Sequence, residues 1–226
     1  MTNKGSIAGK VAIVTGAGRG LGRAMAVGLA RAGVNVIATA ARQGDEIEDV
    51  AAAGASPPRG GQIVPVVADV TKEVAAERTV GVALERFGRL DIMVNTAGLG
   101  MKYVSAHFMT EPPRFWEVDP ATWRMVIDTN VTGPFLMARA AVPHLLRPDG
   151  GRLVNISMNH ATMRRPGFSP YGPSKAALES ETVIWAGDLV ATGITVNALL
   201  PGGATATGKN RAERGTHIIN MGSAPR

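Results

Sequence analysis

The sequence has no cysteine among its 226 residues, which excludes disulfides and thiolate metal sites. It has only four histidines, His107, His144, His160 and His217, and their spacing matches no metal-ligand pattern. No spacing singles out a nucleophile, a histidine and an acid as a hydrolytic set. No apolar run reaches the length of a membrane span, and no signal-peptide core precedes the first predicted strand. These absences favour a cytoplasmic protein with neither a metal nor a membrane partner.

Aromatic residues are also scarce, at 4% of the chain. This matters because the net charge of +6 could suggest a nucleic-acid partner, yet no motif pairs basic residues with aromatics for base stacking. The last stretch holds much of the excess charge, with Lys209, Arg211, Arg214 and Arg226 against the single acid Glu213. We therefore expect no nucleic-acid partner, and part of the remaining charge could serve a phosphorylated ligand.

Alternating strand and helix patterns run through most of the chain, with no internal repeat and no linker that divides it. The length and this continuity predict one domain over residues 1–226. Short apolar, β-branched runs predict strands at 10–14, 35–39, 63–68, 90–94, 152–156 and 194–199. Helical patterns cover 23–31, 45–53, 71–87, 119–146 and 171–191. The alternation predicts an α/β fold, a doubly wound parallel sheet with ligands at the carboxyl ends of its strands.

A glycine-rich turn joins the first predicted strand to the first helix. Its spacing is Thr15-Gly16-x-x-x-Gly20-x-Gly22, whereas the commoner dinucleotide spacing would need a glycine at Leu21. Glycines let the backbone approach a phosphate, and the helix that follows offers free N–H groups and the positive end of its dipole. A tight turn without a ligand is the alternative. The position between strand and helix favours anion binding.

The end of the second predicted strand lacks the acid that would bind the adenosine ribose hydroxyls. It reads Ala40-Ala41-Arg42 instead. Arg42, together with Arg19 in the glycine-rich turn, could face a 2′-phosphate, for which a guanidinium is a suitable partner. Either arginine could equally be solvated. We expect NADP(H) in preference to NAD(H).

Two residues that could move a proton begin the last predicted helix. Tyr171 and Lys175 are four residues apart, so they share one helical face. A nearby ammonium favours the phenolate and lowers the tyrosine pKa, which would let the pair exchange a proton with an alcohol or a carbonyl oxygen. An amphipathic surface pair is the alternative for this common spacing.

Two further stretches leave alternatives open. The segment with Phe108, Phe115 and Trp116 around Pro112-Pro113 could be a substrate lid or a loop packed on the core. Asn130 lies inside the long helical pattern 119–146, where an asparagine usually forms local hydrogen bonds that bend the helix.

The sequence resembles the short-chain dehydrogenase/reductase family over roughly residues 9–207. The resemblance rests on several motifs in the family's order: the glycine-rich turn, Asp69-Val70, Asn95-Thr-Ala-Gly98, Asn130, Tyr171-x-x-x-Lys175 and Pro201-Gly202. It implies a Rossmann-type fold, an NAD(P)-dependent oxidoreductase that transfers a hydride between the cofactor and a small alcohol or carbonyl substrate, and the homodimers or homotetramers usual in the family.

The resemblance also implies roles for individual residues. Tyr171 would be the general acid or base, Lys175 would lower its pKa and hold the nicotinamide ribose, and Asn130 would steady a water in a proton relay. Asp69 would bind the adenine edge, and Thr205 or Thr207 would contact the nicotinamide amide. The implied cofactor-binding set is Gly16, Arg19, Gly20, Leu21, Gly22, Arg42, Asp69, Val70, Asn95, Ala97, Gly98, Tyr171, Lys175, Pro201, Gly202 and Thr205.

The sequence departs from the family at the serine that polarises the substrate carbonyl. Thirteen residues before Tyr171 stands Met158, which cannot donate a hydrogen bond. Ser157 comes one residue earlier, and since side chains alternate along a strand it can act only if the strand has ended or carries a bulge. Asn159 is another possible donor. We expect Ser157 to complete the catalytic set with Asn130, Tyr171 and Lys175.

The second departure is the stretch 208–226, which does not resemble the family's C-terminal lid, helix and final strand. We therefore expect the chain to lack these parts, which would leave the edge of the sixth strand exposed. Together with Met158, this supports an alternative function, a protein that binds the cofactor with little or no catalysis.

Overall fold

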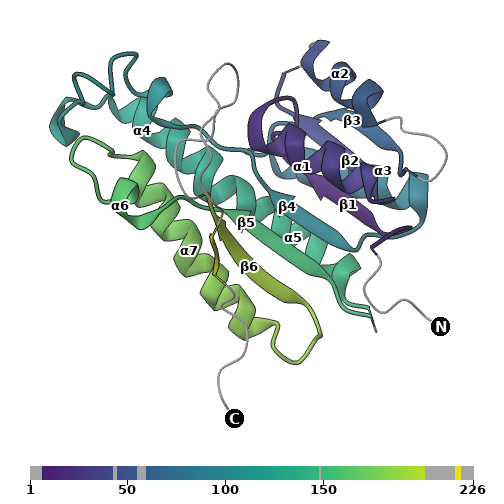
Figure 1. Ribbon diagram of the computed structural model, residues 1–226. Helices are drawn as coiled ribbons and strands as arrows, with labels where there is room; N and C mark the ends of the chain where they lie inside the picture. The colour runs from purple at the N-terminus through teal and green to yellow at the C-terminus, as the bar shows by residue number, and fades with distance from the viewer. Residues whose placement is uncertain (1–6, 43–44, 55–59, 148, 202–216, 220–226) are drawn as a thin grey trace.

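A computed structural model describes residues 7–42, 45–54, 60–147, 149–201 and 217–219 of the chain. It contains one seven-stranded sheet in the order β3-β2-β1-β4-β5-β6-β7 (Figure 1). The first six strands in the chain pair in parallel, and β7 is antiparallel to β6. The strands are β1 Val11–Val14, β2 Asn35–Ala40, β3 Ile63–Val67, β4 Ile92–Asn95, β5 Arg152–Ile156, β6 Thr195–Leu200 and β7 His217–Ile219.

Helices cover the sheet on both faces. One apolar core joins the sheet to α1 and α2, and a second core joins the opposite face to α3, α5 and α7. The helices are α1 Gly20–Arg31, α2 Asp45–Gly54, α3 Glu73–Phe87, α4 Pro120–Ile127, α5 Gly133–Leu145, α6 His160–Met163 and α7 Tyr171–Asp188. Short 3₁₀ helices, η1 Met101–Tyr103 and η2 Phe115–Glu117, follow β4, and a π-helical segment, η3 Asp128–Thr132, joins α4 to α5. None of the helices in the described ranges is long and apolar enough to cross a membrane.

Strand β1 shows why the short apolar runs of the sequence become central strands. Val11 and Ile13 belong to the core under α3 and α5, whereas Ala12 and Val14 belong to the core under α1 and α2. All four are buried, because successive side chains of a strand point to opposite faces and both faces are covered. The strand order reverses between β1 and β4, and in such sheets ligands bind at the carboxyl ends beside this reversal.

The predicted doubly wound α/β sheet is confirmed, and six strands lie close to the six predicted ranges. The single helix predicted over 119–146 is instead three segments, α4, η3 and α5. The helix expected to begin after Thr71 begins at Glu73, because Thr71 donates from its N and Oγ1 to Asp69 Oδ1 at 3.0 and 2.8 Å. These differences change helix ends and leave the layers unchanged.

The edge of β6 differs from the expectation. An exposed edge was predicted, but β7 pairs antiparallel with it, placing Ile219 opposite Ala198, Ile218 opposite Leu199 and His217 opposite Leu200. The short apolar pattern at 217–219 is therefore used as a strand. The prediction of an unpaired edge is wrong for the carboxyl half of β6.

A group of charges joins the amino ends of β1 and β4. The carboxylate of Asp91 is only 3% exposed and accepts hydrogen bonds from Val11 N and Arg89 Nε, both at 2.8 Å. Lys10 Nζ lies 3.5 Å from its other oxygen. Burial alone would raise the pKa of Asp91, but the hydrogen bonds from Arg89 and Val11 N outweigh burial and hold that pKa below its usual value.

Replacing Asp91 with alanine is expected to lower the free energy of unfolding by about 3 kcal/mol, because Val11 N–H and Arg89 lose a buried acceptor. Since the carboxylate has a lowered pKa in the folded state, its stabilisation is complete above the unfolded-state pKa of about 4 and disappears as pH falls through the folded-state pKa. Urea denaturation at pH 7 and between pH 5 and 3 measures both effects. Asp149→Ala is the control, because Asp149 meets the same two bases at the surface and its loss should cost much less. Equal losses in the two variants would contradict this account.

Candidate active site

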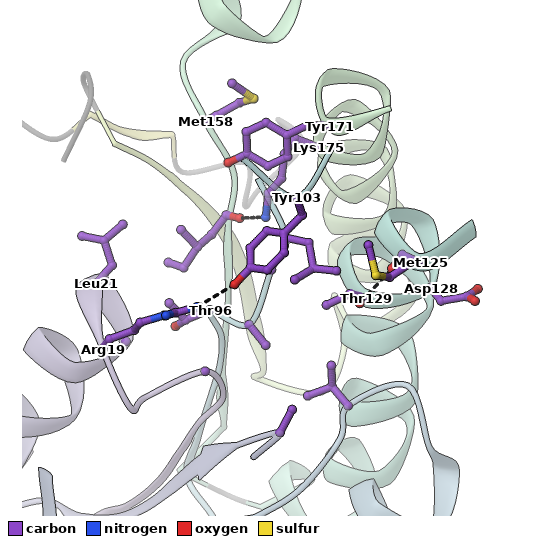
Figure 2. A pocket seen from close by; sticks show the side chains of 18 of the residues that line it. Arg19, Leu21, Thr96, Tyr103, Met125, Asp128, Thr129, Met158, Tyr171 and Lys175 are labelled. Atoms are coloured by element: carbon purple, nitrogen blue, oxygen red, sulfur yellow. Dashed lines mark hydrogen bonds between the residues drawn. The ribbon is translucent and has the colours of Figure 1, made fainter. Parts of the chain in front are cut away.

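A cavity of about 1480 Å³ lies at the carboxyl ends of the strands. The glycine-rich turn, the ends of β2, β3, β4 and β5, and the start of α7 all contribute to its wall. The cavity therefore lies at the edge of the sheet where the sequence predicts the ligand-binding groups. Figure 2 shows the side chains around it.

The glycine-rich turn is packed too tightly for side chains. Gly16 has a φ of +63°, and a Cβ there would lie 2.7 Å from Ala97 Cα. A Cβ at Gly22 would lie 2.3 Å from Gly16 O. Helix α1 begins at Gly20 with no side chain capping it and no acid in its first turn. Its first N–H groups therefore suit an anion, which is what a dinucleotide pyrophosphate requires.

Thr15 ties this turn to the end of β4. Its Oγ1 accepts hydrogen bonds from Thr96 N at 3.0 Å and Ala97 N at 3.1 Å. Sequence reasoning treated Thr15 as part of the turn motif and gave it no contact of its own. Only the spatial neighbourhood of β1 and β4 assigns it this function. Thr15 holds the floor of the cavity across the reversal point of the sheet.

The predicted nucleotide-facing residues mostly line the cavity. Those that do are Gly16, Arg19, Leu21, Gly22, Arg42, Asp69, Val70, Ala97, Gly98 and Pro201. Asp69 uses Oδ1 to accept from Thr71, so the turn fixes its carboxylate beside the cavity. Gly20 begins α1 with a φ of +61°. Gly202, Thr205 and Thr207 lie outside the described residues.

Asn95 is the last residue of β4. Its side chain is buried at 2% exposure, and Nδ2 donates to Asn155 Oδ1 at 2.8 Å. It is not among the residues that line the cavity. This hydrogen bond joins β4 to β5 inside the sheet. The cofactor contact of Asn95 stays a prediction.

The two arginines predicted to face a 2′-phosphate lie on the same cavity wall, but in different surroundings. Arg19 Nη2 donates to Tyr103 Oη at 2.6 Å (Figure 2), whereas Arg42 is exposed and has no hydrogen-bond partner in the described ranges. Sequence reasoning missed Glu46 of α2, which lines the cavity at the same end. A Cβ at Gly18, the residue before Arg19, would lie 3.7 Å from Glu46 Oε2. The carboxylate of Glu46 therefore lies beside the glycine-rich turn.

Tyr171 and Lys175 both point from the first turns of α7 to the cavity (Figure 2). The Lys175 side chain is buried, and its Nζ donates to Ile156 O at 2.7 Å. Burial lowers the pKa of Lys175 to about 8. Burial also raises the pKa of Tyr171 above its ordinary value, which is opposite to the direction predicted from the sequence. The structure thus brings the predicted pair together but favours the neutral phenol.

Asn130 is fully buried in η3. Its Oδ1 accepts from Leu99 N at 2.7 Å, and Nδ2 donates to Leu99 O at 3.0 Å and to Ser174 Oγ at 2.9 Å. The predicted helix irregularity is present, but the hydrogen bonds of the side chain are long-range and not local. A Cβ on Gly98 would lie 3.2 Å from Asn130 Oδ1 and 3.5 Å from Lys175 Nζ. Asn130 thereby joins the segment after β4 to the start of α7.

Strand β5 ends at Ile156, and the three residues that follow have different surroundings. Ser157 Oγ donates to Glu179 Oε1 at 2.5 Å, so its single proton is used within the fold. Met158 packs with Tyr171, and Asn159 Oδ1 caps α6 by accepting from Thr162 N at 2.9 Å. Asn159 lines the cavity, and its Nδ2 donates no hydrogen bond within the described ranges. Ser157 also lines the cavity, so its donor role stays a prediction, although its proton is directed to Glu179.

The aromatic segment matches neither expected alternative, a substrate lid or a loop packed on the core, along its whole length. Phe108 lines the cavity and meets the ring of Phe168 edge-on, with centroids 6.1 Å apart. Phe115 and Trp116 are about two-thirds exposed and contact each other. The described residues contain no group of three or more histidines and acids that could hold a metal.

Comparison with known proteins gives the same family throughout. A family model described as short chain dehydrogenase matches residues 10–217. Over 197 residues the chain is 32% identical to a 3-oxoacyl-[acyl-carrier-protein] reductase of Synechocystis sp., covering 87% of this chain and 75% of that one. Over 200 residues it is 35% identical to glucose 1-dehydrogenase 2 of Bacillus subtilis, covering 87% and 72%.

Solved structures agree with the sequence matches. A dehydrogenase/reductase of Sinorhizobium meliloti 1021 superimposes with a TM-score of 0.75 at 36% identity, covering 85% of this chain and 71% of that one. A metagenomic short-chain oxidoreductase in complex with NADP superimposes with a TM-score of 0.76 at 28% identity, covering 88% and 85%.

Proposed function

This chain belongs to the short-chain dehydrogenase family of NAD(P)-dependent oxidoreductases, and from that premise we propose that it reduces a small carbonyl compound with NADPH, or oxidises the corresponding alcohol. The observation that carries the proposal is that Tyr171 and Lys175 face the same cavity as the open N-terminus of α1. The cavity can thus bring a proton donor and a dinucleotide to one substrate.

The nucleotide end of the cavity suits the cofactor, because Gly16 and Gly22 leave no room for side chains between the turn and the strand ends. The N–H groups of α1 would bind the pyrophosphate, Asp69 would meet the adenine, and Lys175 would hold the nicotinamide ribose. When bound, the reduced nicotinamide supplies the hydride. Arg42 and Arg19 support NADP(H), whereas Glu46 would suit the ribose hydroxyls of NAD(H).

In the direction of reduction, Tyr171 Oη would donate its proton to the carbonyl oxygen as negative charge develops there. Burial keeps the phenol protonated at neutral pH, which suits it to act as the acid. The Lys175 ammonium would stabilise the phenolate left behind. Asn130, which joins Leu99 to Ser174, would position the start of α7 and steady the water that returns the proton.

A titration of the purified protein with NADPH and NADH tests the cofactor site, with the emission of Trp116, Trp123 and Trp185 as the signal. We expect Arg42→Asp to weaken NADPH binding at least about tenfold, because a charge-assisted contact with the 2′-phosphate is replaced by repulsion. NADH binding should change little.

Arg31→Asp controls for net charge, because Arg31 lies in the last turn of α1 and does not line the cavity. Tighter binding of NADH than NADPH by the wild type would refute the arginine argument and leave the family assignment intact. Binding of neither nucleotide would refute the proposed function.

A cofactor-binding protein with little turnover is the second candidate function. Two observations favour it: Met158 stands where the family has a serine, and Ser157 gives its proton to Glu179. Saturable NADPH binding without reduction of any carbonyl would support this candidate.

A further inference from the structure

Three methionines and a phenylalanine form a buried cluster beside Tyr171, and Met158 is the methionine of this cluster that reaches the cavity. Met101, Met158, Met163 and Phe168 are each at most 8% exposed and form one cluster, against which Tyr171 packs. Figure 2 shows Met158 beside the ring of Tyr171. Met158 and Phe168 themselves line the cavity. A substrate carbonyl that reaches Tyr171 must therefore lie against thioether and aromatic surface.

The polar neighbours of Met158 in the chain are engaged elsewhere. Ser157 donates its hydroxyl proton to Glu179 Oε1 at 2.5 Å, and Glu179 Oε2 also lies 2.8 Å from His160 Nε2. The side-chain oxygen of Asn159 is held by Thr162 N at 2.9 Å. Ser157, Met158 and Asn159 all line the cavity, but these contacts direct the Ser157 proton to α7 and the Asn159 oxygen to α6. A thioether has no proton to donate.

At the position of Met158 the carbonyl oxygen thus meets no proton donor, which leaves Tyr171 as the donor opposite it. Removal of one donor from an oxyanion site typically costs about 10²–10³-fold in rate. An ordinary ketone must bear this loss, because its oxygen carries nearly all of the developing charge. A carbonyl with a second carbonyl next to it needs less stabilisation of its oxygen by donors, since the neighbour withdraws electron density from the reacting carbon.

We infer that the substrates of this enzyme are activated aryl carbonyls, specifically aryl 1,2-dicarbonyl compounds whose flat apolar body packs on the methionine cluster. The inference rests on the proposed function. In the reaction one carbonyl carbon accepts the hydride supplied by NADPH, and its oxygen accepts the proton of Tyr171. The products are an α-hydroxyketone and NADP⁺, and solvent returns a proton to Tyr171.

The body of the substrate is inferred from the rest of the cluster. Methionine side chains are flexible and polarisable and make favourable contacts with aromatic rings. Phe108 and Phe168 add an edge-to-face ring pair to the same surface. An aryl group fits the surface of Met158, Phe108 and Phe168 better than a sugar or another polyol, because these three side chains offer no hydrogen-bond partner of comparable strength to a hydroxyl group.

The test compares kcat/KM for 1-phenyl-1,2-propanedione and propiophenone, which share their aryl body and differ in the second carbonyl. The wild type should prefer the dione by at least about 10³-fold, because only the ketone needs the missing donor. Relative to Met158→Ala, Met158→Ser should raise the ratio of kcat/KM for propiophenone to kcat/KM for the dione at least about tenfold, because only the serine adds a donor. Met158→Ala, which removes similar volume without adding a hydroxyl, should not narrow the preference of the wild type. NADPH affinity, measured by tryptophan quenching, should stay near the wild-type value in all three proteins.

Three results would overturn the inference. A wild type that reduces propiophenone nearly as fast as the dione already has a second donor, and Asn159 Nδ2 would then be the group to test. Equal effects of Met158→Ser and Met158→Ala would show that volume and not a proton donor limits the ketone. If NADPH binds but none of the three proteins reduces either compound, the inferred substrate class is wrong, whereas the proposed function is refuted only if other carbonyl compounds are not reduced either.

Discussion

Replacing Tyr171 with phenylalanine is expected to lower kcat/KM for carbonyl reduction by about 10³-fold, because the reacting oxygen loses its proton donor. Binding of NADPH should be nearly unchanged, since the ring remains packed on the methionine cluster and Lys175 remains on the same face of α7. Steady-state kinetics and tryptophan quenching measure the two effects separately. A loss confined to kcat/KM would identify the phenol as the acid.

The pH dependence of the same variant gives a second measurement. Burial raises the pKa of Tyr171, so the phenol is protonated at neutral pH and reduction should depend little on the state of this group between pH 6 and 8. Alcohol oxidation needs the phenolate and should rise by about tenfold per pH unit over the same interval. Tyr171→Phe should lose this rise.

Retention of activity within about tenfold in Tyr171→Phe would remove Tyr171 from the reaction, since positioned acids contribute more than that. The sequence has only two tyrosines, and the other, Tyr103, also lines the cavity. Tyr103→Phe would then be the variant to measure.

The second large effect is expected from Gly22→Ala, which should weaken NADPH binding by at least about 100-fold. The added Cβ would lie 2.3 Å from Gly16 O, and Gly16 cannot move away because it is itself packed against Ala97. The turn must open, so the N–H groups at the start of α1 lose their alignment. Titration with NADPH measures the loss, and a cooperative thermal melt shows whether the variant still folds.

Gly28→Ala is the matched control in the same helix. A Cβ at Gly28 meets no atom within 4 Å, so the change should stabilise α1 by about 1 kcal/mol and leave NADPH affinity unchanged. If Gly22→Ala bound NADPH as the wild type does, the phosphate would not lie at this turn. Equal weakening in both variants would indicate a general effect on α1.

The layers of the fold could be predicted from the sequence because they depend on short-range patterns. Apolar runs of four to six residues became the parallel strands, and the turn with Gly16 and Gly22 formed where a strand meets a helix. The family motifs also placed Tyr171 and Lys175 on one cavity with the turn. These features need only local spacing and one rule of topology.

The directions of side chains at strand ends could not be predicted in the same way. Ser157 and Met158 follow β5 directly, and which of them faces Tyr171 depends on where the strand ends and on Glu179, 22 residues beyond Ser157. The hydrogen bond that Asn95 donates to Asn155 on the next strand could not be predicted either. The direction in which the pKa of Tyr171 shifts depends on how deeply the side chain is buried, and the spacing of residues in the sequence does not reveal this.

The π-helical segment between α4 and α5 limits where the chain can lose a residue. An α-helix turns by about 100° per residue, so η3 sets how α5 is rotated relative to α4. Deletion of one residue from 128–132 would allow a continuous α-helix, but it would rotate Met137, Ala141 and Leu145 out of the core. This stretch should therefore accept single exchanges at its exposed position, Asp128, and no single-residue deletion.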